Sequence, residues 1–301
     1  MNLKSLLDRS FQSSPVTVAV AQAADSEVIL AIKEAVKIGL ASFILIGDEA
    51  ELVPLLNNAK LDHKGPRIQI LHQKTEAGCV QKAVEEVREG RAQILMKGNL
   101  QTKTLLQSVL NRENGLRNGK VLSHVSVFEF PTQNRLFLLT DAAMNVAPSL
   151  KDKTMIVQNA VEVARSIGIQ LPKVAPLAAV EVVNESMPAS VDAALLSQMQ
   201  KRGQIADCII DGPLAFDIAI SKEAALHKKI ESPVAGEADI LLVPTIEVGN
   251  ALYKSFVYFA QAKVAGIIYG AKSPIVLTSR ADSAESKLYS LALAICSVNK
   301  N

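Results

Sequence analysis

The sequence predicts an α/β fold of two lobes built on parallel sheet, and three observations support that prediction. Short apolar runs alternate with segments of helical periodicity along most of the chain. Ala, Val, Ile and Leu are abundant, whereas only 4% of residues are aromatic and none is Trp. This composition favours helices packed on buried parallel strands over an all-β sandwich. The length of 301 residues suits either one large α/β domain or two domains that share a cleft.

The first 96 residues predict a doubly wound parallel sheet. Residues 16–21 form an apolar run rich in Val, and Asp25 or Ser26 is positioned to cap a helix that runs to about residue 39. A second strand is expected at residues 43–48. The same βαβ rhythm repeats with a strand at residues 68–71, a helix at 76–89 and a strand at 94–96.

The middle of the chain breaks this rhythm. Two strand-like runs, at residues 121–130 and 135–140, are joined by the turn-forming residues Pro-Thr-Gln-Asn, which predicts a hairpin. Helical and strand-like segments then alternate again at residues 152–167, 173–180, 191–201, 207–211, 240–243, 264–269, 275–277 and 282–296. We expect one lobe to contain residues 1–128 plus 269–301 and the other residues 129–268.

Charge and cysteine content exclude several classes of protein. Lys plus Arg number 32 against 30 for Asp plus Glu, so bulk charge predicts neither nucleic-acid nor membrane binding. Cys79, Cys208 and Cys296 are far apart and form no CxxC pair, which argues against a disulfide framework or a structural zinc site. We expect Cys208 to be a buried core thiol. With no leader or long apolar run, the chain is expected to be cytoplasmic.

Several standard motifs are absent or imperfect. No G-x-G-x-x-G follows the first strand, and there is no G-x-S-x-G or H-E-x-x-H. Residues 115–120 resemble a P-loop but have one residue too few between the glycines. The four histidines lack metal-ligand spacing, so we expect them to be structural or solvated.

One stretch is far more specific. Residues 232–254 contain Ser-Pro-Val-Ala-Gly, Ala-Asp, Gly-Asn and Tyr-Lys in a pattern that resembles the signature of the phosphate acetyltransferase and phosphate butyryltransferase family. The D-G-P-L-x-x-D-like block at residues 211–217 and Thr-Ser-Arg-Ala-Asp at residues 278–282 also resemble that family. The segments at 96–100, 122–126 and 140–145 are similar to its butyryl branch in particular.

The resemblance implies a two-lobed fold like that of the isocitrate and isopropylmalate dehydrogenases, with the active site in the interlobe cleft. It implies that acyl-CoA, most specifically butyryl-CoA, and phosphate exchange at the acyl carbon to give acyl phosphate and CoA. CoA is then substrate and product, with no metal and no permanently bound cofactor. The resemblance further implies a homodimer or larger homo-oligomer, and a link to an acyl kinase in short-chain fatty acid metabolism.

The resemblance assigns the catalytic roles to Ser279 and Arg280, preceded by Thr278. These residues follow an apolar run at the carboxyl end of an expected strand, which is the edge where open α/β sheets bind ligands. Arg280 is suited to hold phosphate through two hydrogen bonds, and Ser279 to donate to the oxygen of a tetrahedral intermediate. Without the family, a capped helix start with a solvated Arg would be the simpler interpretation.

Further residues are expected to bind substrate. Gly249 and Asn250 are expected to open a helix whose terminal amides hold phosphate or the acyl carbonyl, with Lys254 one turn further on. The alternative is a capping Asn and a Lys that extends to solvent. Lys97 follows the strand at residues 94–96 and is expected to line the same site.

The sequence departs from its relatives at the base that deprotonates CoA. In the acetyltransferases an Asp stands six residues after the motif's Arg, whereas Ser286 occupies that position here. Asp282 and Glu285 are nearby acids that could replace it, and neither matches the motif. A thiol of pKa near 8.5 is already partly ionised at neutral pH and could need little help.

Two other functions stay open from the sequence. One is a related enzyme, either an acetyl-specific phosphotransacetylase or an acyl-carrier phosphate acyltransferase, because one methylene discriminates by only about 1–3 kcal/mol. The other is a non-catalytic subunit that binds CoA or acyl phosphate, which the missing Asp would favour. Intact Ser279 and Arg280 argue against that second alternative.

Overall fold

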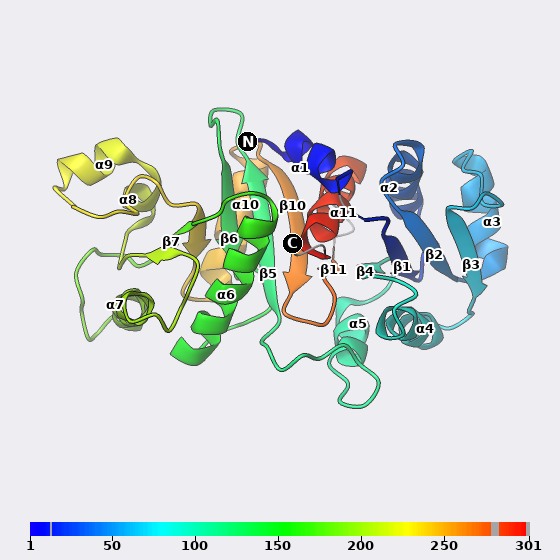
Figure 1. Ribbon diagram of the computed structural model, residues 1–301, viewed down its shortest axis with the longest axis horizontal. Coiled ribbons are helices and arrows are strands. Elements are labelled where there is room, and N and C mark those ends of the chain that lie inside the picture. Colours follow the sequence, from blue (N-terminus) through cyan, green and yellow to red (C-terminus); the bar gives the residue numbers. More distant parts are fainter. Residues whose placement is uncertain (13, 278–282, 299–301) are drawn as a thin grey trace. The chain divides into compact units, whose positions relative to one another are not determined.

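The computed structural model describes residues 1–12, 14–277 and 283–298, and the chain divides into two compact units. The terminal unit contains residues 3–120 and 265–301, and the middle unit contains residues 1–2 and 121–264. Both units combine strands and helices (Figure 1).

The terminal unit is built on strands in the order β3-β2-β1-β4-β11-β10, all parallel except β10, which is antiparallel to β11. Its strands are β1 (Thr17–Ala21), β2 (Ser42–Gly47), β3 (Ile68–His72), β4 (Ile94–Lys97), β10 (Lys263–Tyr269, which begins in the middle unit) and β11 (Ile275–Val276). Its helices are α1 (Leu3–Ser10), α2 (Ser26–Lys37), α3 (Glu49–Asn58), α4 (Glu76–Arg88), α5 (Thr102–Val109) and α11 (Ala284–Val298).

The strand order reverses direction at β1. The chain adds β2 and β3 on one side of β1, then returns through α4 to add β4 on the other side. Helices α2 and α11 lie on one face of this sheet and α4 and α5 on the other (Figure 1). The reversal falls between β1 and β4, and the carboxyl ends of strands at such a reversal are where α/β sheets of this kind bind ligands.

Local sequence explains how α2 forms. Asp25 has extended backbone angles, and its side chain accepts a hydrogen bond from the Val28 amide at 2.9 Å, so of the two predicted candidates, Asp25 and Ser26, it is Asp25 that caps the helix. The apolar face of the helix, including Ile29 and Ile32, is buried. Burial of about 25 cal/mol per Å² of apolar surface holds such a helix on the sheet.

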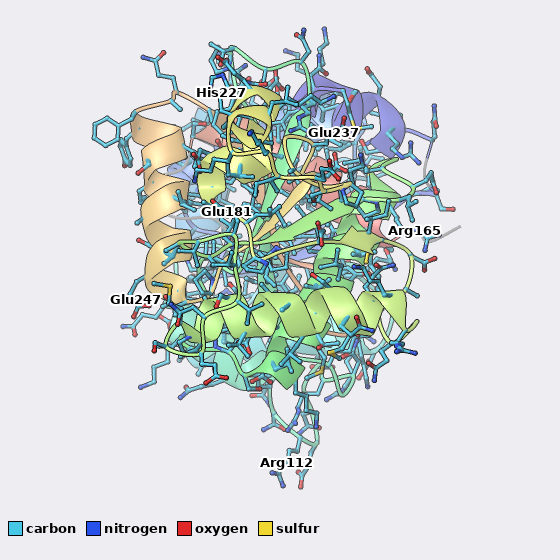
Figure 2. The ribbon with its side chains drawn as sticks, turned by 90° about the vertical axis from the view of Figure 1, so that its left-hand side faces the viewer. Arg112, Arg165, Glu181, His227, Glu237 and Glu247 are labelled. Atoms are coloured by element: carbon cyan, nitrogen blue, oxygen red, sulfur yellow. The ribbon has the colours of Figure 1, made fainter. Side chains whose placement is uncertain are left out.

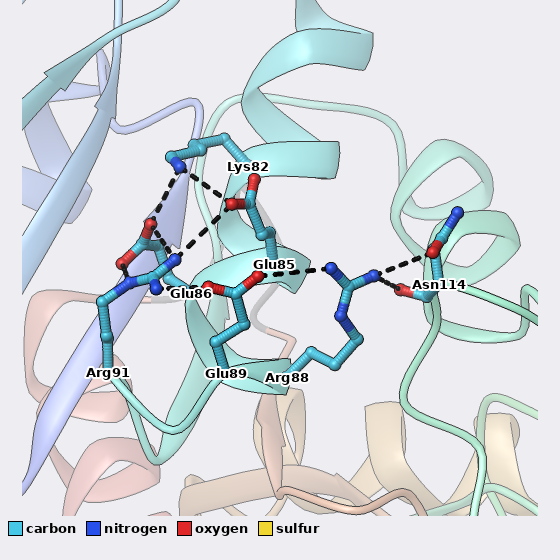
Figure 3. Close-up of polar contacts among 7 residues, drawn as sticks. All are labelled: Lys82, Glu85, Glu86, Arg88, Glu89, Arg91 and Asn114. Carbon is cyan, nitrogen blue, oxygen red and sulfur yellow. Dashed lines mark hydrogen bonds and ion pairs between the residues drawn. The ribbon is translucent and has the colours of Figure 1, made fainter.

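Charged side chains join the end of α4 to the loop that follows α5 (Figure 3). Glu86 is 4% exposed and accepts a hydrogen bond from Arg91 Nε at 2.6 Å, which holds the pKa of the Glu86 carboxyl below its usual range. Lys82 lies 3.1 Å from Glu86. On the neighbouring turn, Arg88 donates to the side-chain and main-chain oxygens of Asn114. The loop after α5 is therefore attached to α4.

The middle unit has strands in the order β5-β6-β9-β7-β8. Its strands are β5 (Ser123–Glu129), β6 (Leu136–Thr140), β7 (Lys173–Pro176), β8 (Ile209–Ile210) and β9 (Ile240–Leu242). Its helices are α6 (Leu150–Ser166), α7 (Pro188–Lys201), α8 (Phe216–Ile220), α9 (Lys222–His227) and α10 (Ile246–Tyr258). β5 and β6 are antiparallel, which confirms the predicted hairpin, and the other pairs are parallel.

Helices also cover both faces of the middle sheet. α6 and α7 pack on one face. On the other face, Phe256 of α10 and Phe128 of β5 meet edge to face, with ring centroids 5.2 Å apart, inside the apolar core. Cys208 is 3% exposed, and burial raises its pKa to about 11, so the prediction of a buried core thiol is confirmed.

Two predicted strands are shorter in the structure than in the sequence prediction. β8 begins at Ile209 because Asp207 has a left-handed φ of 62°, which an extended strand does not allow. β7 ends at Pro176, and Leu177 beyond it makes only an isolated bridge to Leu214.

Candidate active site

Two neighbouring strands of the terminal unit, β1 and β4, end at the edge of the sheet where the strand order reverses. Gln22 follows β1, and Lys97 ends β4 and is followed by Gly98 and Asn99. The Gly98 amide donates to the Ala21 carbonyl at 2.9 Å, and the Asn99 amide donates to the Gln22 carbonyl at 2.8 Å. Main-chain hydrogen bonds thus join the two strand ends directly.

Gly98 is required by this close approach. A Cβ atom at position 98 would lie 2.0 Å from the Gln22 carbonyl oxygen and 2.7 Å from the Ala21 carbonyl oxygen. Both atoms are backbone and cannot move aside without breaking the hydrogen bonds described above. Only glycine fits at this turn.

Lys97 lies at this edge, as predicted, but it is 6% exposed. Its ammonium Nζ donates to the Gly98 carbonyl at 3.2 Å. A buried lysine is stable only with such partners. Its ammonium group is therefore bonded to the turn that follows β4.

Thr278, Ser279, Arg280 and Asp282 lie outside the described residues, but the elements on both sides of them are described. β11 pairs in parallel with β4, with Ile275 beside Leu95 and Val276 beside Met96. The strand that leads into residues 278–282 thus runs beside the strand that leads into Lys97.

The helix that follows residues 278–282 is capped by Ser283. α11 begins at Ala284, and the Ser283 hydroxyl accepts a hydrogen bond from the Ser286 amide at 3.1 Å. Glu285 is exposed in the first turn, and its Oε1 accepts a hydrogen bond from the Tyr289 hydroxyl at 3.1 Å. Ser286 therefore has a structural part in the helix start.

The middle unit has its own turn at the carboxyl end of β6. Asp141 is 2% exposed, and its Oδ1 accepts hydrogen bonds from the amides of Ala143 and Met144 at 2.9 and 3.0 Å. Its other oxygen, Oδ2, accepts from Asn145 Nδ2, which also donates to the Leu122 carbonyl at 2.8 Å. The Asp141 carboxylate is thus fully engaged in shaping the turn.

Gly249 lies against that turn, and the prediction that it opens a helix is wrong. α10 begins at Ile246, and the Gly249 amide donates to the Thr245 carbonyl within the helix at 3.2 Å, so it is not free for a ligand. A Cβ at position 249 would lie 2.6 Å from the Asp141 carbonyl oxygen. The glycine is there for packing, and Asn250 beside it is exposed.

One turn further along α10, Lys254 is exposed whereas its neighbour Tyr253 packs toward His124. Lys254 is exposed, with its ammonium 5.2 Å from the centroid of the Tyr253 ring. The Tyr253 ring lies 6.0 Å from the imidazole of His124, which is 7% exposed and has Ser126 Oγ 3.2 Å from its Nδ1. Because His124 is buried among these contacts, it fits the expectation of a structural histidine and not of a solvated one. Glu247 marks the first turn of the same helix (Figure 2).

A small hollow lies in the middle unit, beyond the carboxyl ends of β7 and β9. Leu177, Val243 and Pro244 are among its apolar lining residues. Its polar lining is the pair Lys153 and Asp192, whose Nζ and Oδ2 are 2.6 Å apart. The hollow is thus lined by apolar side chains and one ion pair.

Two features of these turns were not predicted from the sequence. Gln22 has a left-handed φ of 52°, and Asp141 organises its turn through three hydrogen bonds. The Asp-x-x-x-Asn spacing was a usable signal for the second. No residue near Gln22 in the sequence indicates that its backbone is left-handed.

The described part of the chain contains no group of three or more His, Cys, Asp or Glu residues placed to hold a metal ion. In the same residues, no helix is both long enough and apolar enough to cross a membrane.

Sequence comparisons identify one family. The family model described as "Phosphate acetyl/butaryl transferase" matches residues 57–295. A probable phosphate butyryltransferase of Bacillus subtilis is 54% identical over 98% of each chain. The phosphate butyryltransferase of Clostridium acetobutylicum is 50% identical over 95% of this chain and 94% of its own. A phosphate acetyltransferase of Thermotoga maritima is 45% identical over 92% of this chain and 93% of its own.

Solved structures show the same fold. A branched-chain phosphotransacylase from Enterococcus faecalis matches with a TM-score of 0.82 and 41% identity, covering 95% of this chain and all of the other. A phosphotransacetylase from Streptococcus pyogenes matches with a TM-score of 0.84 at 20% identity, over 99% of each chain. A putative 4-hydroxythreonine-4-phosphate dehydrogenase from Salmonella typhimurium matches with a TM-score of 0.56 at 14% identity, covering 94% of this chain and all of the other.

Proposed function

Since the chain belongs to the phosphate acetyl/butaryl transferase family, we propose that it converts a short-chain acyl-CoA and inorganic phosphate to an acyl phosphate and CoA. Butyryl-CoA is the proposed preferred substrate, because relatives named for butyryl transfer are 47–54% identical to this chain over nearly its whole length. An acetyl preference is the second candidate, supported by the Thermotoga maritima relative at 45% identity.

The observation that supports this assignment most directly is the pairing of β11 with β4. The two strands are parallel neighbours, so their carboxyl ends lie at the same edge of the sheet, which is the ligand-binding edge in this class of fold. One strand leads into residues 278–282, which contain Ser279 and Arg280, and the other ends at Lys97. Residues expected to handle phosphate thus follow adjacent strands.

The proposed chemistry needs three groups. A phosphate oxygen attacks the thioester carbonyl carbon, the carbon–sulfur bond then breaks, and CoA leaves as a thiolate that takes up a proton. Arg280 holds the phosphate in two hydrogen bonds, and Ser279 donates to the oxyanion of the tetrahedral intermediate. Thr278 supports them as a substrate contact. In the reverse direction Asp282 or Glu285 is the proposed base for the CoA thiol.

In the middle unit, Asn250 and Lys254 are the proposed substrate contacts. Both are exposed on α10, so a ligand can reach them. Gly249 keeps an indirect role, because it allows α10 to approach the turn at Asp141.

The wider setting of the enzyme is also a proposal. We place it in the cytoplasm, in line with three buried free thiols, and beside an acyl kinase that would use the acyl phosphate. CoA is proposed as substrate and product only, with no metal or resident cofactor.

A homo-oligomer is proposed because Tyr258 and Phe259, at the end of α10, are 68% and 89% exposed. We also propose, from the family resemblance, that the fold is of the isocitrate and isopropylmalate dehydrogenase type.

The test of the reaction is thiol release from acetyl-, propionyl-, butyryl-, isobutyryl- and octanoyl-CoA, each with and without inorganic phosphate. We expect phosphate-dependent release with a maximum at four carbons. A maximum at two carbons would support the acetyl candidate. Absence of release with every acyl-CoA would overturn the proposed reaction.

The test of the site compares two arginines. Arg280→Ala should lower phosphate-dependent turnover by about 100-fold or more, because the phosphate loses its cationic partner. Arg112→Ala is the matched control, since Arg112 is exposed and extends outward from the loop after α5 (Figure 2), and its kinetics should stay unchanged. Unchanged phosphate kinetics in Arg280→Ala would remove that residue from the mechanism.

A further inference from the structure

We propose that Gln22 is a positioning residue of the active site, which fixes the turn of Lys97, Gly98 and Asn99 at the end of β4. The inference rests on the proposed function, because it takes that turn to be part of the substrate site. It adds a residue that directly follows the first strand and lies outside the segments that resemble the family signature.

The ends of β1 and β4 are joined by two main-chain hydrogen bonds, from Gly98 to Ala21 and from Asn99 to Gln22, and we call this pair of bonds the joint. The backbone of Gln22 makes the joint possible. In an extended strand successive carbonyls point to opposite sides, so only one of two consecutive carbonyls can face a given neighbouring strand. Here the carbonyls of Ala21 and Gln22 both accept hydrogen bonds from the β4 side, from Gly98 and Asn99. The left-handed φ of 52° at Gln22 turns the second carbonyl toward β4. The next amide, of Ala23, returns to β2 by donating to the Ile46 carbonyl at 2.9 Å.

Most other left-handed residues in the described chain have an ordinary explanation that Gln22 lacks. Lys60, Lys229 and Gln261 follow the ends of α3, α9 and α10, where a left-handed residue commonly ends a helix. Gln22 instead follows a strand. Glycine is the residue that takes this conformation without cost, yet the chain has a glutamine here. We infer that a side-chain contact holds the left-handed backbone of Gln22 in place, a constraint that a glycine would not need.

That contact is a tether to α4. Gln22 Oε1 accepts a hydrogen bond from the Cys79 thiol, with Oε1 and Sγ 3.2 Å apart. Cys79 is fully buried, and burial raises the pKa of its thiol, so at neutral pH the sulfur keeps the proton that it donates. Gly47, at the end of β2, is also close, since an added Cβ there would lie 3.3 Å from the same oxygen. The amide is thus held between β2 and α4, and the backbone of Gln22 is held with it.

This arrangement gives Gln22 two separable parts, a backbone conformation and a side-chain tether. Gln22→Ala removes the tether and keeps the cost of a left-handed φ, so the turn is free to relax. Gln22→Gly also removes the tether but accepts the left-handed conformation readily. A residue that touched the substrate through its side chain would be impaired equally by both changes.

We therefore expect the two variants to differ. Gln22→Ala should lower kcat/KM by about 10- to 100-fold, because a displaced turn misplaces substrate groups. Gln22→Gly should retain activity within about threefold of the wild type, since its backbone can hold the same turn. Cys79→Ser, which keeps a donor, should retain more activity than Cys79→Ala, which does not.

A second readout reports on the joint without using activity. The amides of Gly98 and Asn99 donate to the two carbonyls that Gln22 positions. Their hydrogen exchange should accelerate at least about tenfold in Gln22→Ala and less in Gln22→Gly. Exchange at the Leu45 amide, inside β2, should be the same in all variants.

The outcomes separate the inference from the proposed function. Wild-type kinetics and wild-type exchange in Gln22→Ala would overturn the positioning role. Equal losses in the Ala and Gly variants, with exchange unchanged, would overturn it in favour of direct contact with substrate. Absence of phosphate-dependent thiol release in the wild type would instead refute the proposed function, while the exchange measurement would still test the joint.

Discussion

The turn that follows β4 in the terminal unit and the turn that follows β6 in the middle unit are held together by different kinds of contact. Each brings two main chains together at a glycine, Gly98 in the terminal unit and Gly249 in the middle unit. In the terminal unit the contacts that join the strand ends are main-chain hydrogen bonds to Ala21 and Gln22. In the middle unit the Asp141 carboxylate binds the turn through side-chain hydrogen bonds.

The difference indicates what each turn tolerates. A turn held by main-chain contacts depends on the absence of a side chain at its glycine and on the backbone angle opposite it. A turn held by a carboxylate depends on the identity of that side chain. Substitutions that are harmless in one turn should therefore be costly in the other.

Gly98→Ala should have the largest effect. Its Cβ would lie 2.0 Å from a backbone oxygen, so the turn must shift as a whole. We expect a loss of about 3 kcal/mol in the free energy of unfolding and of about 100-fold in kcat/KM. Urea unfolding and acyl transfer assays measure both. Gly90→Ala, in open space but with a φ of 77°, is the control and should cost only about 1 kcal/mol.

Gly249→Ala should have the next largest effect. Its Cβ would lie 2.6 Å from the Asp141 carbonyl oxygen, 2.8 Å from Ala142 Cα and 2.9 Å from Val243 Cγ2, and these approaches are less close than the 2.0 Å at position 98. We expect a loss of about 2 kcal/mol in the free energy of unfolding, seen as a lower Tm in calorimetry. Val248→Ala, a partly exposed neighbour on α10, should stay within about 0.5 kcal/mol of the wild type. A wild-type Tm for Gly249→Ala would show that α10 can move away from the turn.

Asp141→Asn tests the side-chain half of the comparison. The new amide offers one acceptor where the carboxylate offered two, and its NH₂ group would face either main-chain amides or the Asn145 amide. We expect a loss of about 1–2 kcal/mol in the free energy of unfolding, measured in urea. The exposed acid Glu185 provides the control, Glu185→Gln, which should be neutral. Equal stability of Asp141→Asn and the wild type would show that the turn is held without the carboxylate.

Glu86→Gln should have the smallest effect and gives the reference for a partly solvated charged contact. The folded-state pKa of Glu86 is lowered, mainly by Arg91, so its stabilising contribution exists above the unfolded pKa and is lost as pH falls through the folded pKa. We expect a cost of about 1 kcal/mol at pH 7 that shrinks steadily below about pH 4.5.

The exposed neighbour Glu89 is the control for that measurement, because Glu89→Gln should have no measurable effect at either pH. Urea unfolding of the three proteins at pH 7 and pH 3.5 makes the comparison. A Glu86→Gln deficit that persists unchanged at low pH would mean that packing, and not charge, stabilises the end of α4.

Much of the fold could be predicted from local patterns. The alternation of apolar runs and helical segments indicated β1 to β4, and the Pro-Thr-Gln-Asn turn indicated the β5–β6 hairpin. Asp25 was identified as a cap because the capping interaction spans three residues. The start of α10 was placed too late, at Gly249, since Gly-Asn is as typical of a helix boundary as of a close packing contact.

The sequence by itself determined the class of fold, the family and the segments that carry the candidate catalytic groups. Each of these depends on short local patterns, namely apolar runs, helical periodicity and motifs a few residues long. The tertiary structure alone decided that Gln22 is left-handed, that Gly98 admits no side chain and that the Gly249 amide lies within a helix. The physical reason is distance along the chain. Gln22 is fixed by Cys79 and Asn99, residues that only the doubly wound sheet brings to the end of β1, and no local propensity contains that contact.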